Sequence, residues 1–369
     1  MPTLKTPCIA GFGEVMLRLA PEGFKRLSQV LPGQVEATFG GAEANVCAAV
    51  SYLGGQSRFL TALPDTPVSQ AFATQLRGIG CDVSAIHYDT RGRMGIYFVE
   101  TGSMMRGGSV VYDRSGSTIA TLRPEEYDFQ AMLKGATHLH LTGITPALSR
   151  NAFESTLAIA QCASDMGIAV SVDLNFRSKL WDWEEGTGRH ELAARCMAEI
   201  VPFADIIFSS EGTTMDVFGI KAPGSSSGIG RQDTEVCLRS AQLLAERFPK
   251  AKLIAYTLRE SISADHNNFG GMLYDTAARK AFFAPRDADG KCELYPMRDI
   301  VDRIGGGDAF DGALLYALTT PELADFQTAI NFAAAAGAMS HAILGDYNCV
   351  TRSEVLQLMN GSASGRVKR

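Results

Sequence analysis

Short apolar runs alternate with longer segments in which apolar residues recur at helical spacing. The runs are rich in β-branched residues and are bounded by polar or glycine-containing stretches, which is typical of buried strands. They cover Cys8 to Phe12, Arg58 to Ala62, His138 to Thr142, Ala169 to Asp173, Asp205 to Ser209 and Lys252 to Thr257. The helical segments cover Ala44 to Leu53, Val68 to Gly78, Asn151 to Met166 and Thr234 to Arg247. This alternation predicts an α/β fold with a mainly parallel central sheet covered by helices on both faces.

Two segments do not follow this alternation. Residues 16–39 and 93–119 are strand-like, richer in Gly and Arg, and have no strong helical pattern between their strands. We expect them to form a small separate sheet over the ends of the main one. Because ligands of open α/β sheets bind outside the carboxyl ends of the strands, such a sheet would act as a lid. No fixed-period repeat or linker interrupts the chain, so residues 1–360 are interpreted as one domain and residues 361–369 as a flexible tail.

A glycine-rich turn followed by a carboxylate comes late in the chain. Apolar residues after Asp308 recur at helical spacing and predict a helix that opens near Asp308 and ends before Pro321. The backbone N–H groups of Gly305, Gly306 and Gly307 would then face an anion at the positive end of the helix. Asp308 would be placed to accept a proton from an attacking hydroxyl. A plain helix cap is the alternative interpretation of Asp308.

Composition narrows the functional classes. The net charge of −6 argues against a broad surface for nucleic acid or membrane. The longest uncharged stretch, Thr328 to Leu344, is too short and too polar for a confident membrane span, so a buried helix is expected. The eight cysteines are scattered without a C-x-x-C pair, and no export signal is apparent, which favours a reducing cytoplasm over a disulfide or zinc framework. Pro223 to Gly230 is expected to be a surface loop.

Three motifs together resemble the ribokinase-like (PfkB) carbohydrate kinases. They are GGAEANV at 40–46, DLNFR at 173–177 and DRIGGGD at 302–308, and the likeness runs over nearly the whole chain. Within that family, the segments LTGITPAL at 141–148 and TLRES at 257–261 resemble the kinases of 2-keto-3-deoxygluconate. The resemblance implies a three-layer α/β/α fold with a β lid, and a sugar-acid kinase that transfers phosphate from ATP to O6 with Mg²⁺. Lid strands often pair between subunits in this family, so a homodimer is expected.

The resemblance also implies the residues that contact the sugar acid. They are Gly41, Ala42, Asn45, Tyr97, Tyr112, Arg114, Ile144, Arg177 and Asp346. The residues themselves support part of this set. Tyr112 and Arg114 are two apart on an expected strand and therefore share a face. Arg177 follows a strand at the end of the sheet where α/β sites lie, and a guanidinium there can hold a carboxylate or phosphate.

Each of these residues has a structural alternative. Arg114 and Arg177 could form ion pairs within the protein, and Tyr97 and Tyr112 could pack in the lid without touching a ligand. Gly41 could serve a tight turn, and Asn45 could face water near a helix start.

The nucleotide side departs from the family pattern in several places. Arg303 and Gly306 replace the usual Thr and Ala before the catalytic Asp, and Arg303 could either assist at the phosphates or point to solvent. The family's Asn-x-x-Glu motif aligns with Ser210 to Thr213, so its carboxylate is missing, and Glu211 is the candidate to act on metal-bound water. The resemblance places Ser210, Thr257, Arg259, Gly305 and Gly307 at the nucleotide, although Arg259 stands where the family has glycine.

Other functions remain open at this stage. A fructokinase or ribokinase of the same fold would need few cationic residues at positions 114 and 177. A non-catalytic sugar sensor would have lost the base, yet Asp308 is present. A nicotinamide oxidoreductase would explain Gly11-Phe12-Gly13 after the first strand, but no third glycine follows.

Overall fold

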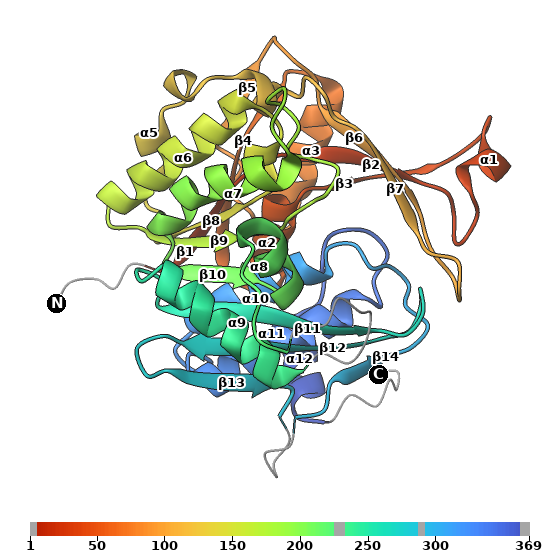
Figure 1. Cartoon of the computed structure of the whole chain (residues 1–369). Coiled ribbons are helices and arrows are strands. Elements are labelled where there is room, and N and C mark those ends of the chain that lie inside the picture. Colours follow the sequence, from red (N-terminus) through yellow and green to blue (C-terminus); the bar gives the residue numbers. More distant parts are fainter. Residues whose placement is uncertain (1–5, 225–232, 287–291, 362–369) are drawn as a thin grey trace.

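The structure is a computed structural model that describes residues 6–224, 233–286 and 292–361. The predicted tail at 362–369 and most of the loop predicted at 223–230 lie outside the described residues. Figure 1 shows a central sheet with helices on both sides and a smaller sheet that projects from one end. No helix within the described ranges has the length and apolar character that crossing a bilayer requires.

The main sheet runs in the order β13-β12-β11-β10-β9-β8-β1-β4-β5, with β14 paired to β12. From β11 to β5 all neighbours are parallel, which confirms the predicted parallel sheet, whereas β12, β13 and β14 pair antiparallel. The bounds are β1 Cys8–Phe12, β4 Gln56–Pro64, β5 Ile86–Asp89, β8 His138–Thr142, β9 Ala169–Asp173, β10 Ile206–Ser209, β11 Leu253–Ser261, β12 Asn267–Asp275, β13 Lys280–Ala284 and β14 Tyr295–Met297.

Helices cover both faces of this sheet. The α2, α10, α11 and α12 helices pack on one face, and α6, α7 and α9 pack on the other. The longer helices are α2 Ala42–Tyr52, α3 Pro67–Gly78, α6 Arg150–Asp165, α7 Arg189–Ile200, α8 Glu211–Phe218, α9 Thr234–Arg247, α10 Gly306–Leu318, α11 Phe326–Ser340 and α12 Arg352–Met359. Short helices are α1 Leu27–Val30, α4 Thr118–Thr121 and α5 Phe129–Leu133, and 3₁₀ turns cover Pro124–Glu126, Thr145–Ala147 and Val201–Phe203.

The apolar pattern of the strands explains why helices pack on both faces of the central sheet. In β1, Ile9 packs against the α10 and α11 side, whereas Ala10 and Phe12 pack against the α6 and α7 side. Successive strand residues point to opposite faces, so a strand buried on both sides must be apolar at almost every position. The helix predicted at 328–344 is observed as α11 and is largely buried, as expected.

The lid is a separate four-stranded sheet in the order β3-β2-β6-β7, as predicted. Its strands are β2 Met16–Ala20, β3 Glu36–Gly40, β6 Gly95–Glu100 and β7 Ser109–Asp113. The β2–β6 pair is parallel and the other two pairs are antiparallel. In Figure 1 the lid extends away from the main sheet and carries α1 at its far end.

One buried arginine fastens the lid to the body. Arg18 on β2 is 2% exposed and forms ion pairs with Asp302, which precedes α10, and with Asp346, which follows α11. The Arg18 Nη1 to Asp346 Oδ1 distance is 2.8 Å. A guanidinium between two carboxylates offsets the cost of burying all three charges. The lid strand is thereby joined to segments that lie about 300 residues further along the chain.

A buried glutamate links α2 to the sheet. Glu43 Oε1 accepts hydrogen bonds from the hydroxyls of Thr142 (2.8 Å) and Thr145 (3.2 Å), while Oε2 has no partner among the described residues. A Cβ at Gly13 would lie 2.0 Å from the Glu43 carboxylate, so this glycine makes room for the side chain. Burial raises the pKa of Glu43 to about 7. Gly13 therefore serves helix packing rather than a dinucleotide-binding turn.

The raised pKa of Glu43 predicts a specific dependence of stability on pH. The folded state holds the proton up to about pH 7, whereas the unfolded state releases it near pH 4.5. Stability from this group is therefore present below about pH 4.5 and is lost as pH rises to about 7. In Glu43→Gln the side chain does not ionise, so the variant does not lose this stability as pH rises. The free energy of unfolding of the variant minus that of the unchanged protein should therefore be roughly 3 kcal/mol larger at pH 8 than at pH 4.5.

Urea denaturation of both proteins at the two pH values measures this difference. Glu235→Gln on the exposed side of α9 is the matched control and should leave the pH dependence nearly unchanged. An equal effect of Glu43→Gln at both pH values would contradict the proposed linkage.

Candidate functional site

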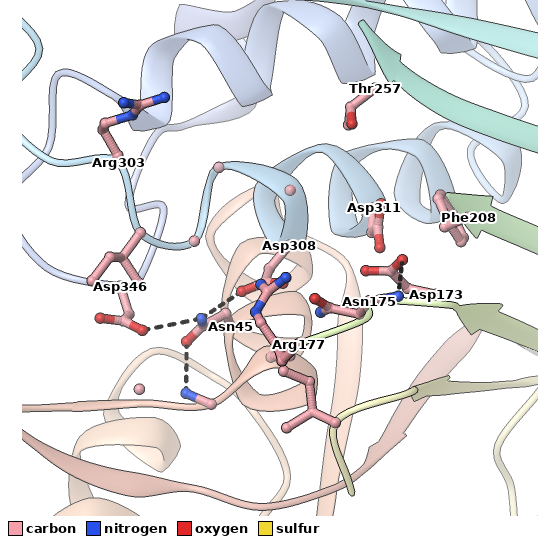
Figure 2. A pocket seen from close by; sticks show the side chains of 18 of the residues that line it. Asn45, Asp173, Asn175, Arg177, Phe208, Thr257, Arg303, Asp308, Asp311 and Asp346 are labelled. Carbon is pink, nitrogen blue, oxygen red and sulfur yellow. Dashed lines mark hydrogen bonds between the residues drawn. The ribbon is translucent and has the colours of Figure 1, made fainter. Parts of the chain in front are cut away.

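A cavity of about 390 Å³ lies between the lid and the carboxyl ends of the central strands. Residues that follow β1, β8, β9 and β10 line it, together with the start of α2, the start of α10 and lid residues from β2, β6 and β7. Every residue predicted at the site except Glu211 is among those that line it. Figure 2 shows many of them converging from different elements.

The glycine turn opens α10 as predicted. Gly305 is the N-cap and has a left-handed φ of 80°, and a Cβ there would lie 2.3 Å from the Asp346 carbonyl oxygen. Both observations explain why a glycine occupies this position. The N–H groups of the first helical turn, from Gly306 and Gly307 onward, are free of intrahelical partners by the geometry of any helix start. The positive end of α10 therefore faces the cavity.

Asp308 lies in the first turn of α10 but does not cap the helix. Its Oδ2 accepts a hydrogen bond of 2.7 Å from Asn45 Nδ2, so the alternative of a plain helix cap is wrong. Burial raises the pKa of Asp308 to about 6, the Asn45 hydrogen bond and the charge of Arg177 oppose the rise, and Asp346 adds to it. A carboxylate with such a pKa is ionised at neutral pH and is a competent proton acceptor.

Asn45 connects several parts of the site through one amide. Besides Asp308, its Nδ2 donates to Asp346 Oδ2 at 3.4 Å, and its Oδ1 accepts from the Gly41 N–H at 3.2 Å. The side chain is 3% exposed, so the alternative that it faces water is wrong. Figure 2 shows this amide between the two carboxylates.

Asp346 is held by the lid. Its Oδ1 accepts from Tyr97 Oη at 2.6 Å and from Arg18, and burial raises its pKa above the ordinary value. Tyr97 is 3% exposed, and burial and the neighbouring carboxylate raise its pKa well above 10. The tyrosine thus reaches the cavity from β6 as expected, with its hydroxyl committed to Asp346.

Arg114 faces the cavity and also forms the ion pair considered as its alternative. Its Nε donates to Glu14 Oε2 at 2.8 Å, and both side chains are at least nine-tenths buried. The guanidinium carbon lies 5.0 Å from the centre of the Tyr112 ring, so these two residues share a face as predicted. Tyr112 in turn lies against Tyr97, with 6.1 Å between ring centres.

Three further guanidinium groups surround the glycine turn. Arg177 is exposed and forms no ion pair with any carboxylate that the structure describes, although its charge lowers the pKa of Asp308. Arg259 lies over the Phe269 ring at 5.6 Å, and its Nη2 would be 3.4 Å from a Cβ at Gly306. Arg303 Nη2 donates to Asn267 Oδ1 at 3.2 Å. Burial and the other arginines lower the pKa of Arg259 to about 10, so it remains charged at neutral pH.

The departures from the family pattern at 259 and 303 therefore bring positive charge to the glycine turn. Arg303 does not simply point to solvent, because its guanidinium lies between β12 and the cavity.

Two further carboxylates, those of Asp173 and Asp311, lie beside Asp308. Asp173 ends β9 and Asp311 lies one helical turn after Asp308, and Figure 2 shows their side chains facing each other. Burial and the charge of Asp308 raise the pKa of Asp173 to about 7, and burial with both neighbours raises that of Asp311 well above its ordinary value. His140 approaches Asp311 to 3.9 Å, but burial lowers its pKa to about 3 and keeps the ring neutral.

The residues predicted at the nucleotide lie at the ends of neighbouring strands. Ser210 follows β10 and caps α8 by accepting from the Thr213 N–H at 3.1 Å, and Thr257 lies on β11. Both line the cavity. Glu211 begins α8 and is not among the residues that line the cavity, so its action on metal-bound water stays a prediction.

Backbone positions complete the predicted set. Gly41, Ala42 and Ile144 all line the cavity, and Gly41 is the N-cap of α2. The φ of Gly41 is 176°, and a Cβ there would lie 2.2 Å from the Glu14 carbonyl oxygen, so close packing against the segment after β1 requires this glycine. The helix starts of α2 and α10 therefore both point to the region around Asp308.

Several lining residues were missed at the level of sequence. They are Glu14, Met16, Asp173, Asn175, Phe208, Ser209, Thr213 and Asp311, while Arg18 and Asp302 act from behind the cavity. For Asp173 a signal was present, because a carboxylate at the carboxyl end of a predicted parallel strand is placed at the site edge.

Comparison with known proteins places this geometry in a family. The family model described as "pfkB family carbohydrate kinase" matches residues 8–255. The crystal structure of 2-dehydro-3-deoxygluconokinase from Thermotoga maritima is 33% identical, with a TM-score of 0.84, over 96% of this chain and 99% of that one. A 2-dehydro-3-deoxygalactonokinase of Haloferax volcanii is 29% identical over 96% of this chain and 97% of its own length.

Fructokinases are also among the relatives. A probable fructokinase of Arabidopsis thaliana is 27% identical over 90% of this chain and 85% of its own length. The similarity to 2-dehydro-3-deoxygluconokinase extends over essentially the whole chain, in sequence and in fold. With a carboxylate at a glycine-rich helix start, a family model that matches two thirds of the chain and relatives that match nearly all of it, the chain belongs to the pfkB family of carbohydrate kinases.

Proposed function

We propose that this kinase phosphorylates the 6-hydroxyl of 2-keto-3-deoxygluconate with ATP and Mg²⁺. The observation that carries the proposal is the position of Asp308 at the positive start of α10, with Arg177 beside it and with no ion pair to a described carboxylate. The position of Asp308 supports transfer of a phosphoryl group. The guanidinium of Arg177 supports a substrate with a negative charge. The names of the relatives support the same class of substrate.

The geometry suggests how the residues divide the work. Asp308 accepts the proton of the attacking hydroxyl, and Asn45 holds its carboxylate in place. The N–H groups of Gly305 to Gly307 and the arginines around them stabilise negative charge on the transferred group. ATP supplies the phosphoryl group, and Mg²⁺ neutralises phosphate charge. The lid carries Tyr97, Tyr112 and Arg114 to the sugar side and limits access of water.

Cellular location and assembly follow as parts of the proposal. The proposed location is the cytoplasm, and the proposed assembly is a homodimer. Pairing of the two subunits through lid strands is consistent with β3 and β7 as the outer strands of the lid sheet.

The first prediction concerns the substrate. In a coupled assay of ADP release, 2-keto-3-deoxygluconate should give a kcat/KM at least about tenfold above those of fructose and ribose, because only the acid engages the cationic residues. The C4 epimer, 2-keto-3-deoxygalactonate, belongs in the same panel. Turnover of fructose without turnover of either keto-deoxy acid would overturn the substrate assignment. Binding of a sugar without ADP release from any of them would favour a sensor.

The second prediction concerns the base. Asp308→Asn should lower kcat by roughly a hundredfold or more, because an amide cannot accept the proton. Nucleotide affinity, measured by calorimetry, should change little. Near-normal kcat would remove Asp308 from the role of base.

The third prediction concerns the charge of the substrate. Arg177→Met should raise KM for 2-keto-3-deoxygluconate by about tenfold or more, since it removes a guanidinium from the site without leaving a described carboxylate unpaired. Arg114 is less suitable, because its loss would strand buried Glu14. The control is Arg239→Met, which removes an exposed guanidinium paired with Glu235 on α9 and should leave KM unchanged. Equal KM values for the Arg177 and Arg239 variants would contradict the role of Arg177.

A further inference from the structure

Asp311 has a buried carboxyl group for which the described residues provide no cationic partner. The side chain is 3% exposed, and its Oδ2 has no hydrogen-bond partner among the described residues. The nearest candidate partner, His140 Nε2, is 3.9 Å from Oδ2 and is itself without a hydrogen bond among the described residues. An uncompensated carboxylate in an enclosed site is costly unless a bound cation or proton offsets it.

Asp173 lies against Asp311 and ends β9, a strand between the sugar side and the nucleotide side of the cavity. In the sheet, β9 lies between β8, whose end carries Ile144, and β10, whose end carries Ser210. The register pairs Asp173 with Phe208, two residues before Ser210. Figure 2 shows the Asp173 and Asp311 side chains facing each other on the side of Asp308 that leads to Thr257. The two carboxylates therefore lie between the sugar side and the nucleotide side.

The segment in which a metal-related carboxylate was expected does not supply one to the cavity. Ser210 uses its hydroxyl to cap α8, and Thr213 stands where the family pattern has its acid. Glu211 belongs to the first turn of α8 and not to the residues that line the cavity. The acid that this segment lacks is present across the cavity, on α10.

We propose that Asp173 and Asp311 together bind the divalent cation that accompanies the nucleotide, with Asp311 supplying the carboxylate that the Ser210 to Thr213 segment lacks. Mg²⁺ characteristically takes one or two protein carboxylates and completes its shell with phosphate oxygens and water. This composition agrees with the described residues, which contain no group of three or more His, Cys, Asp or Glu arranged for a metal. Phosphate oxygens of the nucleotide would complete the coordination shell of the cation, so the inference rests on the proposed use of ATP.

The test measures metal affinity rather than turnover. Mn²⁺ is titrated into the protein with a non-hydrolysable ATP analogue and without sugar acid, and free Mn²⁺ is followed by electron paramagnetic resonance. Asp311→Asn and Asp173→Asn should each weaken Mn²⁺ binding in the ternary complex by about tenfold or more. Glu211→Gln is the matched control and should leave the affinity unchanged. Unaltered affinity in Asp311→Asn, or a loss confined to Glu211→Gln, would overturn the proposal.

A measurement on the unchanged protein covers the case in which a variant fails to fold. Fe²⁺ replaces Mg²⁺ in the presence of the ATP analogue, and ascorbate with hydrogen peroxide generates radicals that cleave the backbone near the metal. Cleavage near residues 173 and 311 is expected, and cleavage confined to residues 210–213 would contradict the proposal. Because sugar acid is absent from both experiments, an incorrect substrate assignment would leave these results unaffected, and it would be recognised separately in the substrate panel.

Discussion

The ion pairs of Arg18 with Asp302 and Asp346 are the interaction on which the arrangement of the site depends. Burying the two carboxylates is tolerable only while the guanidinium lies between them, because removal of Arg18 would leave two buried negative charges without a partner. Asp302 also accepts the N–H groups of Ile304 and Gly345, so it shapes the turn that leads into α10. The lid strand, the glycine turn and the loop after α11 are therefore held as one unit.

The cavity brings opposite charges into close proximity without cancelling them. Arg177, Arg259 and Arg303 lie around the glycine turn, whereas Asp308, Asp173 and Asp311 lie along one side of α10 and the end of β9. A nucleotide with its cation has the complementary distribution, with negative phosphates for the arginines and a positive metal for the carboxylates. Burial and the mutual repulsion of the carboxylates raise the pKa values of Asp173 and Asp311.

Much of the fold could be predicted because local patterns determine it. Runs such as Cys8 to Phe12 contain no charged residue and are apolar at nearly every position, and this pattern holds for any strand buried on both faces. The glycine turn and Asp308 were identifiable because a helix start and an anion site share the same backbone chemistry. The antiparallel strands β12 to β14 were missed. The sequence of β12 mixes apolar residues with two glycines and two asparagines, and β13 and β14 have only five and three residues, too few to show a period.

The buried charges could not be predicted, because their partners are distant in sequence. Arg18 alternates with apolar residues in β2 and has the pattern of a solvent-facing strand position, yet its partners lie far along the chain. Glu14, between β1 and β2, likewise pairs with Arg114, which directly follows β7. Asn45 was assigned to sugar hydroxyls from the family motif, and only the three-dimensional structure shows its amide bonded to Asp308 and Asp346.

The hydrogen bonds of Asn45 have a consequence for when the site becomes ordered. Its two amide hydrogens and its oxygen are all used, by Asp308, Asp346 and the Gly41 N–H. A rotation that exchanged the oxygen and nitrogen would place an acceptor against two carboxylates and a donor against a donor. The orientation of the Asp308 carboxylate is thus fixed during folding, before any ligand arrives, so ligand binding does not have to bear the entropic cost of ordering it.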